Sequence, residues 1–160
     1  MKKILCTLLL SAAGMMSTNL LAQNTPLQNT PLQNTPLMKP APVAVYEAFG
    51  EKPGLIKLMD DFMVRLVANP LTGPVFGPAN QVRIKAELVE QFCQLLSGPC
   101  TYQGLSMKAA HASLHINKPQ FNALVEELQK SMDAMNIPFR DQNQLLAQLA
   151  PMYRDVITVK

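Results

Sequence analysis

Residues 53–70 read PGLIKLMDDFMVRLVANP, and the spacing of the apolar side chains in this stretch decides the fold class. They recur at i, i+3, i+4, i+7 and i+11, as on one face of an α-helix: Leu55, Leu58, Met59, Phe62 and Leu66. Pro53 suits the first turn of such a helix, and Asn69-Pro70 should end it. The stretch therefore predicts a helix with one buried face.

The helical period continues toward the C-terminus. Residues 69–80 contain three prolines and two glycines, so we expect a turn region with one short helical turn there. Longer helices are expected over 80–98, ended by Gly98-Pro99, and from Asn117 to Asn136, with a short helix capped by Ser106 between them. Further apolar residues at helical spacing predict a last helix that Pro151 should kink: Leu145, Leu146, Leu149, Met152, Tyr153 and Val156.

No segment alternates in the way a strand requires, so the sequence predicts an all-α fold with four substantial helices and several short ones. A length of 160 residues suits one domain. Without Lys2 and Lys3 the chain has 12 basic and 11 acidic residues, and no basic stripe is interleaved with aromatic residues. Nucleic-acid binding is therefore not expected.

The first 42 residues differ in composition from the remainder. Residues 1–22 have a charged start, an apolar run and a small residue at Ala22, which predicts a signal peptide and export, to a periplasm-like space in particular. Membrane contact is expected only during that export. Residues 23–37 repeat QNTPL three times, and proline at every fifth position prevents helix, so we interpret residues 23–42 as a disordered tether. The folded domain should span residues 43–160.

The chain has only two histidines, His111 and His115, four residues apart. This spacing on a helix would let both bind one metal ion, but the helix is short and His115 is expected to lie beyond its end. The absence of a CxxCH motif excludes covalent haem attachment. Alanines flank His111, so a bulky flat group can approach it closely. The aliphatic and aromatic residues of the preceding helices suit either an apolar cofactor pocket or plain core packing.

Three blocks carry a resemblance to a known family: YEAFGEKPGLIKLMDDFMVRLVANP, VFGPANQVRIKAELVEQFCQLLSGP, and YQGLSMKAAHASLHI followed by PQFNALVEEL. In order and spacing they resemble the group I truncated haemoglobins, from about Val45 to the C-terminus. This resemblance implies a two-over-two helical globin fold and non-covalent haem b, iron protoporphyrin IX. It also implies binding of diatomic gases (O2, NO, CO) at the haem iron.

The resemblance assigns residue roles by position. His111 matches the proximal histidine, which ligates the haem iron, whereas His115 matches no ligand and is expected at the surface or a haem edge. Phe76 matches a phenylalanine packed on the haem, and Phe92 an aromatic near the apolar tunnel for gases. The other positions that typically touch the porphyrin are Met107, Ile116, Phe121 and Leu124.

Departures from the family pattern concern the distal side of the haem. Met63 stands where many members have a tyrosine, and Leu88 where many have a glutamine. Together with Ile84 at the distal gate, these residues predict an apolar pocket that lacks a donor for a bound oxygen molecule. Gln81 or Gln91 can replace the missing donor, and a thioether ligand from Met63 to the iron is a second option. The family's glycine pairs are half retained as Gly50-Glu51 and Ser97-Gly98.

The residues alone leave two questions open, the state of the two cysteines and the function. Cys93 and Cys100 are too far apart for a disulfide on a continuous helix, but a chain that folds back after Gly98-Pro99 would allow one. The runner-up function is a haem-free exported protein that binds copper or zinc through His111, His115 and methionines. No general acid or base is evident near the predicted distal pocket, so the sequence favours ligand binding and leaves enzyme activity open, as nitric oxide detoxification or electron transfer with an unknown redox partner.

Overall fold

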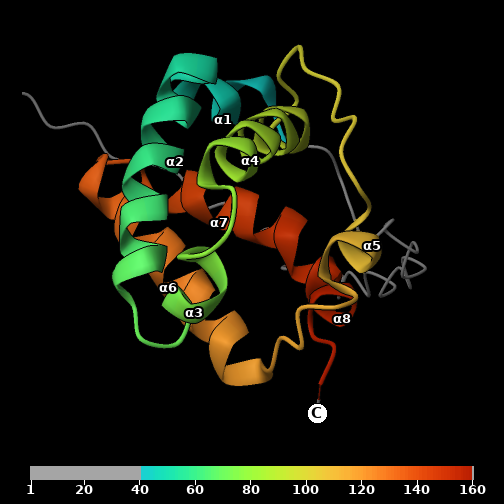
Figure 1. The fold of residues 1–160 in the computed structure, drawn as a ribbon. Helices are drawn as coiled ribbons and strands as arrows, with labels where there is room; N and C mark the ends of the chain where they lie inside the picture. The colour runs from blue at the N-terminus through green and yellow to red at the C-terminus, as the bar shows by residue number, and fades with distance from the viewer. Residues whose placement is uncertain (1–40, 160) are drawn as a thin grey trace, which may run out of the picture. The chain divides into compact units, whose positions relative to one another are not determined.

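The computed structural model describes residues 41–159 of the chain (Figure 1). The predicted signal peptide and residues 23–40 of the predicted tether lie outside the described residues. Within the described part the chain forms eight α-helices and one 3-10 turn, η1, and no strand. They are α1 (Val43–Ala48), α2 (Glu51–Ala68), α3 (Gly73–Phe76), α4 (Gln81–Leu95), α5 (Met107–His111), α6 (Lys118–Ala134), α7 (Phe139–Leu149), η1 (Ala150–Met152) and α8 (Tyr153–Val156). The all-α prediction is confirmed.

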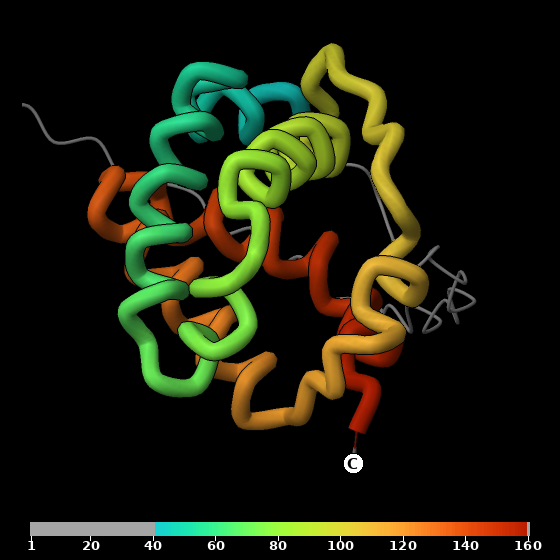
Figure 2. Tube along the Cα trace, viewed as in Figure 1, coloured from blue at the N-terminus to red at the C-terminus, as the bar shows by residue number. Residues whose placement is uncertain are grey.

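Two pairs of long helices form the domain. Helix α2 packs on α4 and on α6, α7 packs on α4 and on α6, and the short helices α1 and α3 attach to α2 (Figure 2). The pair α2–α4 therefore lies over the pair α6–α7, in a two-over-two arrangement. Helix α5 packs mainly against α8, on the side of the domain opposite α2 in this view (Figure 1). None of the helices within residues 41–159 is long and apolar enough to cross a membrane.

The apolar face of α2 forms the centre of the core. All five residues of the predicted stripe, from Leu55 to Leu66, are at most 2% exposed. Full burial of side chains of this size stabilises the fold by about 1.5–3 kcal/mol each. The helix begins at Glu51 and ends at Ala68, as Pro53 and Asn69-Pro70 predicted. The sequence pattern therefore defines both the buried face and the length of this helix.

Side chains cap the helices that follow. The carboxamide oxygen of Asn80 accepts the N–H of Arg83 at the start of α4, and the Ser106 hydroxyl accepts the N–H of Ala109 at the start of α5. Asn117 and Gln120 form a reciprocal capping box at the start of α6. The three caps fix the points at which the chain enters these helices. Those predicted from Ser106 and Asn117 are confirmed.

Left-handed backbone conformations occur where the sequence has incomplete glycine pairs. Gly50 and Glu51 have φ of 74° and 56°, and Ser97 has φ of 62°. Helix α4 ends at Leu95, shortly before the predicted stop at Gly98-Pro99, and the left-handed residue after it is Ser97, while the Gly98 N–H donates to the carbonyl of Cys93. Glycine is still needed at 98, where a Cβ would lie 2.7 Å from the Cys93 sulfur and from the ring of Tyr46.

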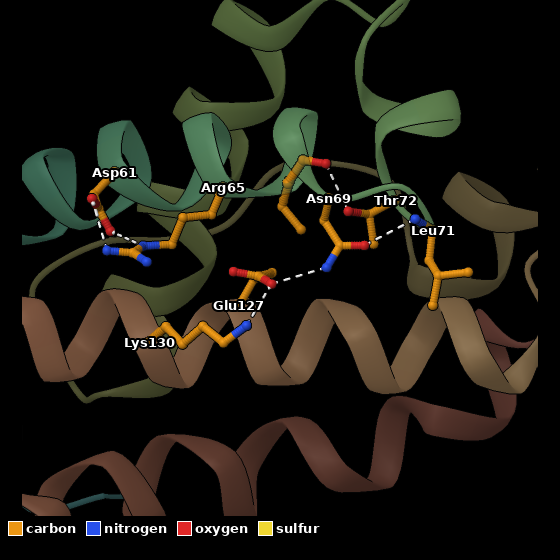
Figure 3. A network of polar contacts seen from close by, with 8 residues as sticks. Asp61, Arg65, Asn69, Leu71, Thr72, Glu127 and Lys130 are labelled. Carbon is orange, nitrogen blue, oxygen red and sulfur yellow. Dashed lines mark hydrogen bonds and ion pairs between the residues drawn. The ribbon is translucent and has the colours of Figure 1, made fainter.

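Polar side chains join the end of α2 to α6 (Figure 3). Glu127 of α6 accepts hydrogen bonds from the Asn69 amide and the Lys130 ammonium, at 2.9 and 2.8 Å. The Thr72 hydroxyl donates to the carbonyl of Leu66 at 2.7 Å. Lys130, and secondarily Asn69, hold the pKa of the Glu127 carboxyl below its usual value. This network fixes the turn that leads into α3 and its Phe76.

The two ends of the domain are also fixed by contacts over long sequence distances. Ala41 is 3% exposed, and its carbonyl accepts a hydrogen bond from the Ser97 hydroxyl, so the packed part of the chain includes this residue of the predicted tether. At the other end, Pro151 lies in η1, which separates α7 from α8. The predicted kink at Pro151 is confirmed.

Candidate functional site

Helix α5 presents His111 as its last residue. The imidazole Nδ1 lies 2.8 Å from the carbonyl oxygen of Met107, one helical turn earlier. A carbonyl only accepts hydrogen bonds, so Nδ1 carries the proton and the lone pair of Nε2 is left for a metal ion. Ala109 and Ala112, on either side, are exposed and small. The arrangement thus offers a half-buried, oriented imidazole with little steric obstruction around it.

Apolar residues predicted to touch a cofactor come from five separate parts of the fold. Phe76 lies on α3, Ile84, Leu88 and Phe92 on α4, Met107 on α5, Ile116 in the following loop, and Phe121 and Leu124 on α6. The structure packs four of them in or against the main apolar core: Phe76, Leu88, Phe92 and Leu124. Met107, Ile116 and Phe121 lie instead on the side of α5 and α8.

The burial of these residues differs from that of the α2 face. Phe92 and Ile116 are 2% and 7% exposed, but Phe76, Ile84, Leu88, Met107, Phe121 and Leu124 are only half-buried. Large apolar side chains on the inward stripes of α4 and α6 thus keep part of their surface accessible. A flat apolar ligand that covered this surface would complete its burial. These apolar surfaces and the free imidazole nitrogen of His111 together fit haem.

The predicted distal residues are apolar in the structure as well. Met63 is 3% exposed and lines a groove of about 300 Å³ between α2 and the first turns of α4. Neither proposed replacement donor is free. The Gln81 amide donates to the carbonyls of Phe76 and Gly77. The amide of Gln91 is turned toward α5 and α8.

Gln91 is 7% exposed, and sequence reasoning missed its role in the fold. Its amide nitrogen lies 3.6 Å from the sulfur of Met107 and 3.8 Å from the sulfur of Met152. Thioethers are weak acceptors, and a buried amide without a good partner costs roughly 1–3 kcal/mol. The buried position of Gln91 facing α5 is therefore not explained by stability alone.

The C-terminal segment holds the chain on the other side of α5. The Ile116 N–H donates to the Thr158 hydroxyl, and the Ile116 carbonyl accepts the N–H groups of Thr158 and Val159, at 3.0–3.1 Å. The rings of Phe121 and Tyr153 meet edge to face with centroids 5.0 Å apart. No sequence signal marked Thr158, because its partner lies 42 residues away.

The loop from α4 to α5 is tied to α4 at several points. Cys93 and Cys100 form a disulfide with Cα atoms 5.7 Å apart, because the chain folds back after Ser97. The Gln94 side chain accepts the N–H of Tyr102 at 2.6 Å. Burial, and to a lesser extent the charge of Glu87, raises the pKa of the Tyr102 hydroxyl. These ties restrict the segment that leads into α5.

His115 lies outside the helix that carries His111. It is exposed, has φ of 53° and follows the end of α5. Among residues 41–159, no group of three or more His, Cys, Asp or Glu side chains is arranged to hold a metal ion. The geometry therefore does not favour a copper or zinc site built from the two histidines.

Comparisons with known proteins agree with this geometry. The bacterial-like globin family matches residues 44–158. The chain is 28% identical over 120 residues to the group 1 truncated hemoglobin GlbN of Mycolicibacterium paratuberculosis, which covers 75% of this chain and 88% of the relative. It is 26% identical over 108 residues to GlbN of Nostoc commune, covering 68% and 92% of the two chains.

A structural comparison points the same way. The truncated hemoglobin of Tetrahymena pyriformis in its Fe(III) form superimposes with a TM-score of 0.67, at 18% sequence identity. The match covers 71% of this chain and 97% of that one. At this level of identity the likeness concerns the fold, which both chains share.

Proposed function

The chain belongs to the bacterial-like globin family, and from this premise we propose that it binds haem b through His111 and takes up diatomic gases. One observation carries the proposal: the Nδ1 of His111 is used by the Met107 carbonyl, 2.8 Å away, which leaves Nε2 free. A hydrogen bond of this kind orients a ligating imidazole and increases its basicity. The half-buried apolar residues of α3, α4 and α6 supply a surface for the porphyrin.

Haem held by His111 and the apolar residues of α3, α4 and α6 would supply an iron atom able to bind a gas molecule. The protein's own contribution on that side is an apolar wall that includes Met63, Ile84 and Leu88. Because these side chains have no N–H or O–H group, they offer no hydrogen bond to an oxygen ligand. We therefore expect oxygen to dissociate quickly, while carbon monoxide and nitric oxide, which depend less on such a bond, are held comparatively well.

A direct test of this proposal is titration of the purified chain with haemin. We expect a Soret band that saturates at one haem per chain, and a five-coordinate spectrum for the reduced protein without added ligand. A low-spin six-coordinate spectrum would instead indicate that the Met63 sulfur ligates the iron. Uptake of copper or zinc without uptake of haem would contradict the proposal.

Export of the protein is a separate part of the proposal. It is supported mainly by the sequence of residues 1–22, with its charged start, apolar run and small residue at Ala22. Disulfides persist in oxidising compartments, so the Cys93–Cys100 bridge is consistent with an exported protein. N-terminal sequencing of the protein recovered from a periplasmic fraction tests this. We expect cleavage after Ala22, and recovery of uncleaved chain from the cytoplasm would contradict it.

A further inference from the structure

Helix α5 has little to hold it in place by itself. It is five residues long, and none of its residues is buried. Helices this short are not stable without outside contacts. Its position, and with it the direction of the His111 ring, must therefore be set by neighbouring parts of the fold.

Gln91 is the buried polar side chain of α4 that reaches α5. Its amide nitrogen contacts the sulfur of Met107, the first residue of α5, and the sulfur of Met152 in η1. The same Met107 supplies the carbonyl that accepts the Nδ1–H of His111 at 2.8 Å. One residue thus receives contacts from the buried amide and from the imidazole.

We propose that Gln91 is a positioning residue for His111, acting through Met107. The amide holds Met107 between α4 and η1, so that its carbonyl points at Nδ1 and keeps the proton there. The inference rests on the proposed function only in its consequence for haem. The geometric claim, that Gln91 determines which imidazole nitrogen carries the proton, concerns the protein without any ligand.

Gln91→Met is the substitution that tests this. Methionine is close to glutamine in length and fills the same space, but it has no N–H group to donate to either sulfur. Gln129→Met on α6 is the matched control, because it makes the same chemical change at a half-buried glutamine that does not face α5. Thermal unfolding of both variants, followed by circular dichroism, verifies that they are folded.

The decisive measurement is the nitrogen-15 NMR spectrum of histidine-labelled, haem-free chain at about pH 8, where imidazoles are neutral. The chain has two histidines, so the spectrum is simple, and exposed His115 serves as the internal reference. In the parent and in Gln129→Met we expect the proton of His111 on Nδ1. In Gln91→Met we expect His111 to approach the tautomer mixture of His115. A His111 tautomer in Gln91→Met equal to that of the parent would overturn the inference.

A second measurement follows the consequence for haem. After haem loading, we expect haem transfer to an acceptor globin to be about three- to tenfold faster for Gln91→Met, and the iron–histidine stretching band to shift. If haem loads through His111 but tautomer, band and transfer rate all match the parent, the positioning role is wrong and the proposed function stands. If the tautomer changes but the parent takes up no haem, the positioning role stands and the proposed function is wrong.

Discussion

The Nδ1 atom of His111 lies 2.8 Å from the carbonyl oxygen of Met107, and this contact makes one imidazole nitrogen a donor and leaves the other free. The contact is local, since the two residues are one helical turn apart. What gives it a defined place in the fold is not local: α5 packs against α8, and the residue after its loop, Ile116, pairs with Thr158 and Val159. The direction of the His111 ring therefore depends on contacts made by the C-terminal segment.

Met63→Tyr should convert the apolar distal side into one with a hydrogen-bond donor. A hydrogen bond to a partly charged acceptor is worth about 1.5–3 kcal/mol, so we expect oxygen to dissociate roughly ten- to a hundredfold more slowly. Stopped-flow measurement of oxygen release from the reduced, haem-loaded protein checks this. Met63→Phe is the matched control, since it adds the ring without the hydroxyl. Equal oxygen release from the tyrosine and phenylalanine variants would show that Met63 does not face the gas ligand.

The Cys93–Cys100 disulfide should stabilise the folded domain. Closing a loop of this length lowers the entropy of the unfolded chain enough to contribute about 2–3 kcal/mol. We expect the denaturant midpoint of the parent to fall on addition of a thiol reductant. Cys100→Ser, at the less buried cysteine, should unfold at the midpoint of the reduced parent and be insensitive to reductant. A parent midpoint unchanged by reductant would mean that the bridge does not form or contributes nothing.

The network around Glu127 predicts a loss of stability in acid. The pKa of Glu127 is lowered by Lys130 and Asn69, and that of Asp61 by Arg65, so the folded chain binds fewer protons than the unfolded chain at low pH. This stabilisation is complete above the ordinary glutamate value of 4.5 and is lost as the pH falls through the lower folded value.

Glu127→Gln separates the contribution of this carboxylate to acid sensitivity from that of the other acidic groups. Glutamine retains an oxygen that can accept from Asn69 but has no charge to titrate. We expect the variant to be less stable than the parent at pH 7 and to lose less stability between about pH 5 and pH 3, as measured by denaturant unfolding. Glu126→Gln, at the exposed neighbour, should follow the parent. Parallel pH curves for Glu127→Gln and the parent would rule out the network as a source of acid sensitivity.

Sequence periodicity predicted those parts of the fold that depend on neighbours close in the chain. The stripe of α2, the caps at Ser106 and Asn117 and the kink at Pro151 each rest on residues within a few positions of one another. The predicted stop at Gly98-Pro99 lies just beyond the end of α4, and the left-handed conformation falls on Ser97. Gly98 is required instead by the close approach of Tyr46.

The surroundings of the candidate site were harder to predict because they depend on contacts between distant segments. His111 and its short helix were found from spacing and resemblance. The partners of that helix were not, because Gln91 meets Met152 across 61 positions and Ile116 meets Thr158 across 42. The sequence offers Gln91 as a replacement distal donor, whereas the structure turns it toward α5. No local pattern indicates which helix face such a side chain will meet.

The central claim, that His111 ligates haem, is tested most directly by removing its imidazole and returning it from solution. His111→Gly should bind haemin without the parent's Soret spectrum, and millimolar free imidazole should restore that spectrum by occupying the vacated space. His115→Asn, which suits the left-handed backbone at that position, should load like the parent. A His111→Gly variant whose haem spectrum equals that of the parent without added imidazole would contradict the central claim.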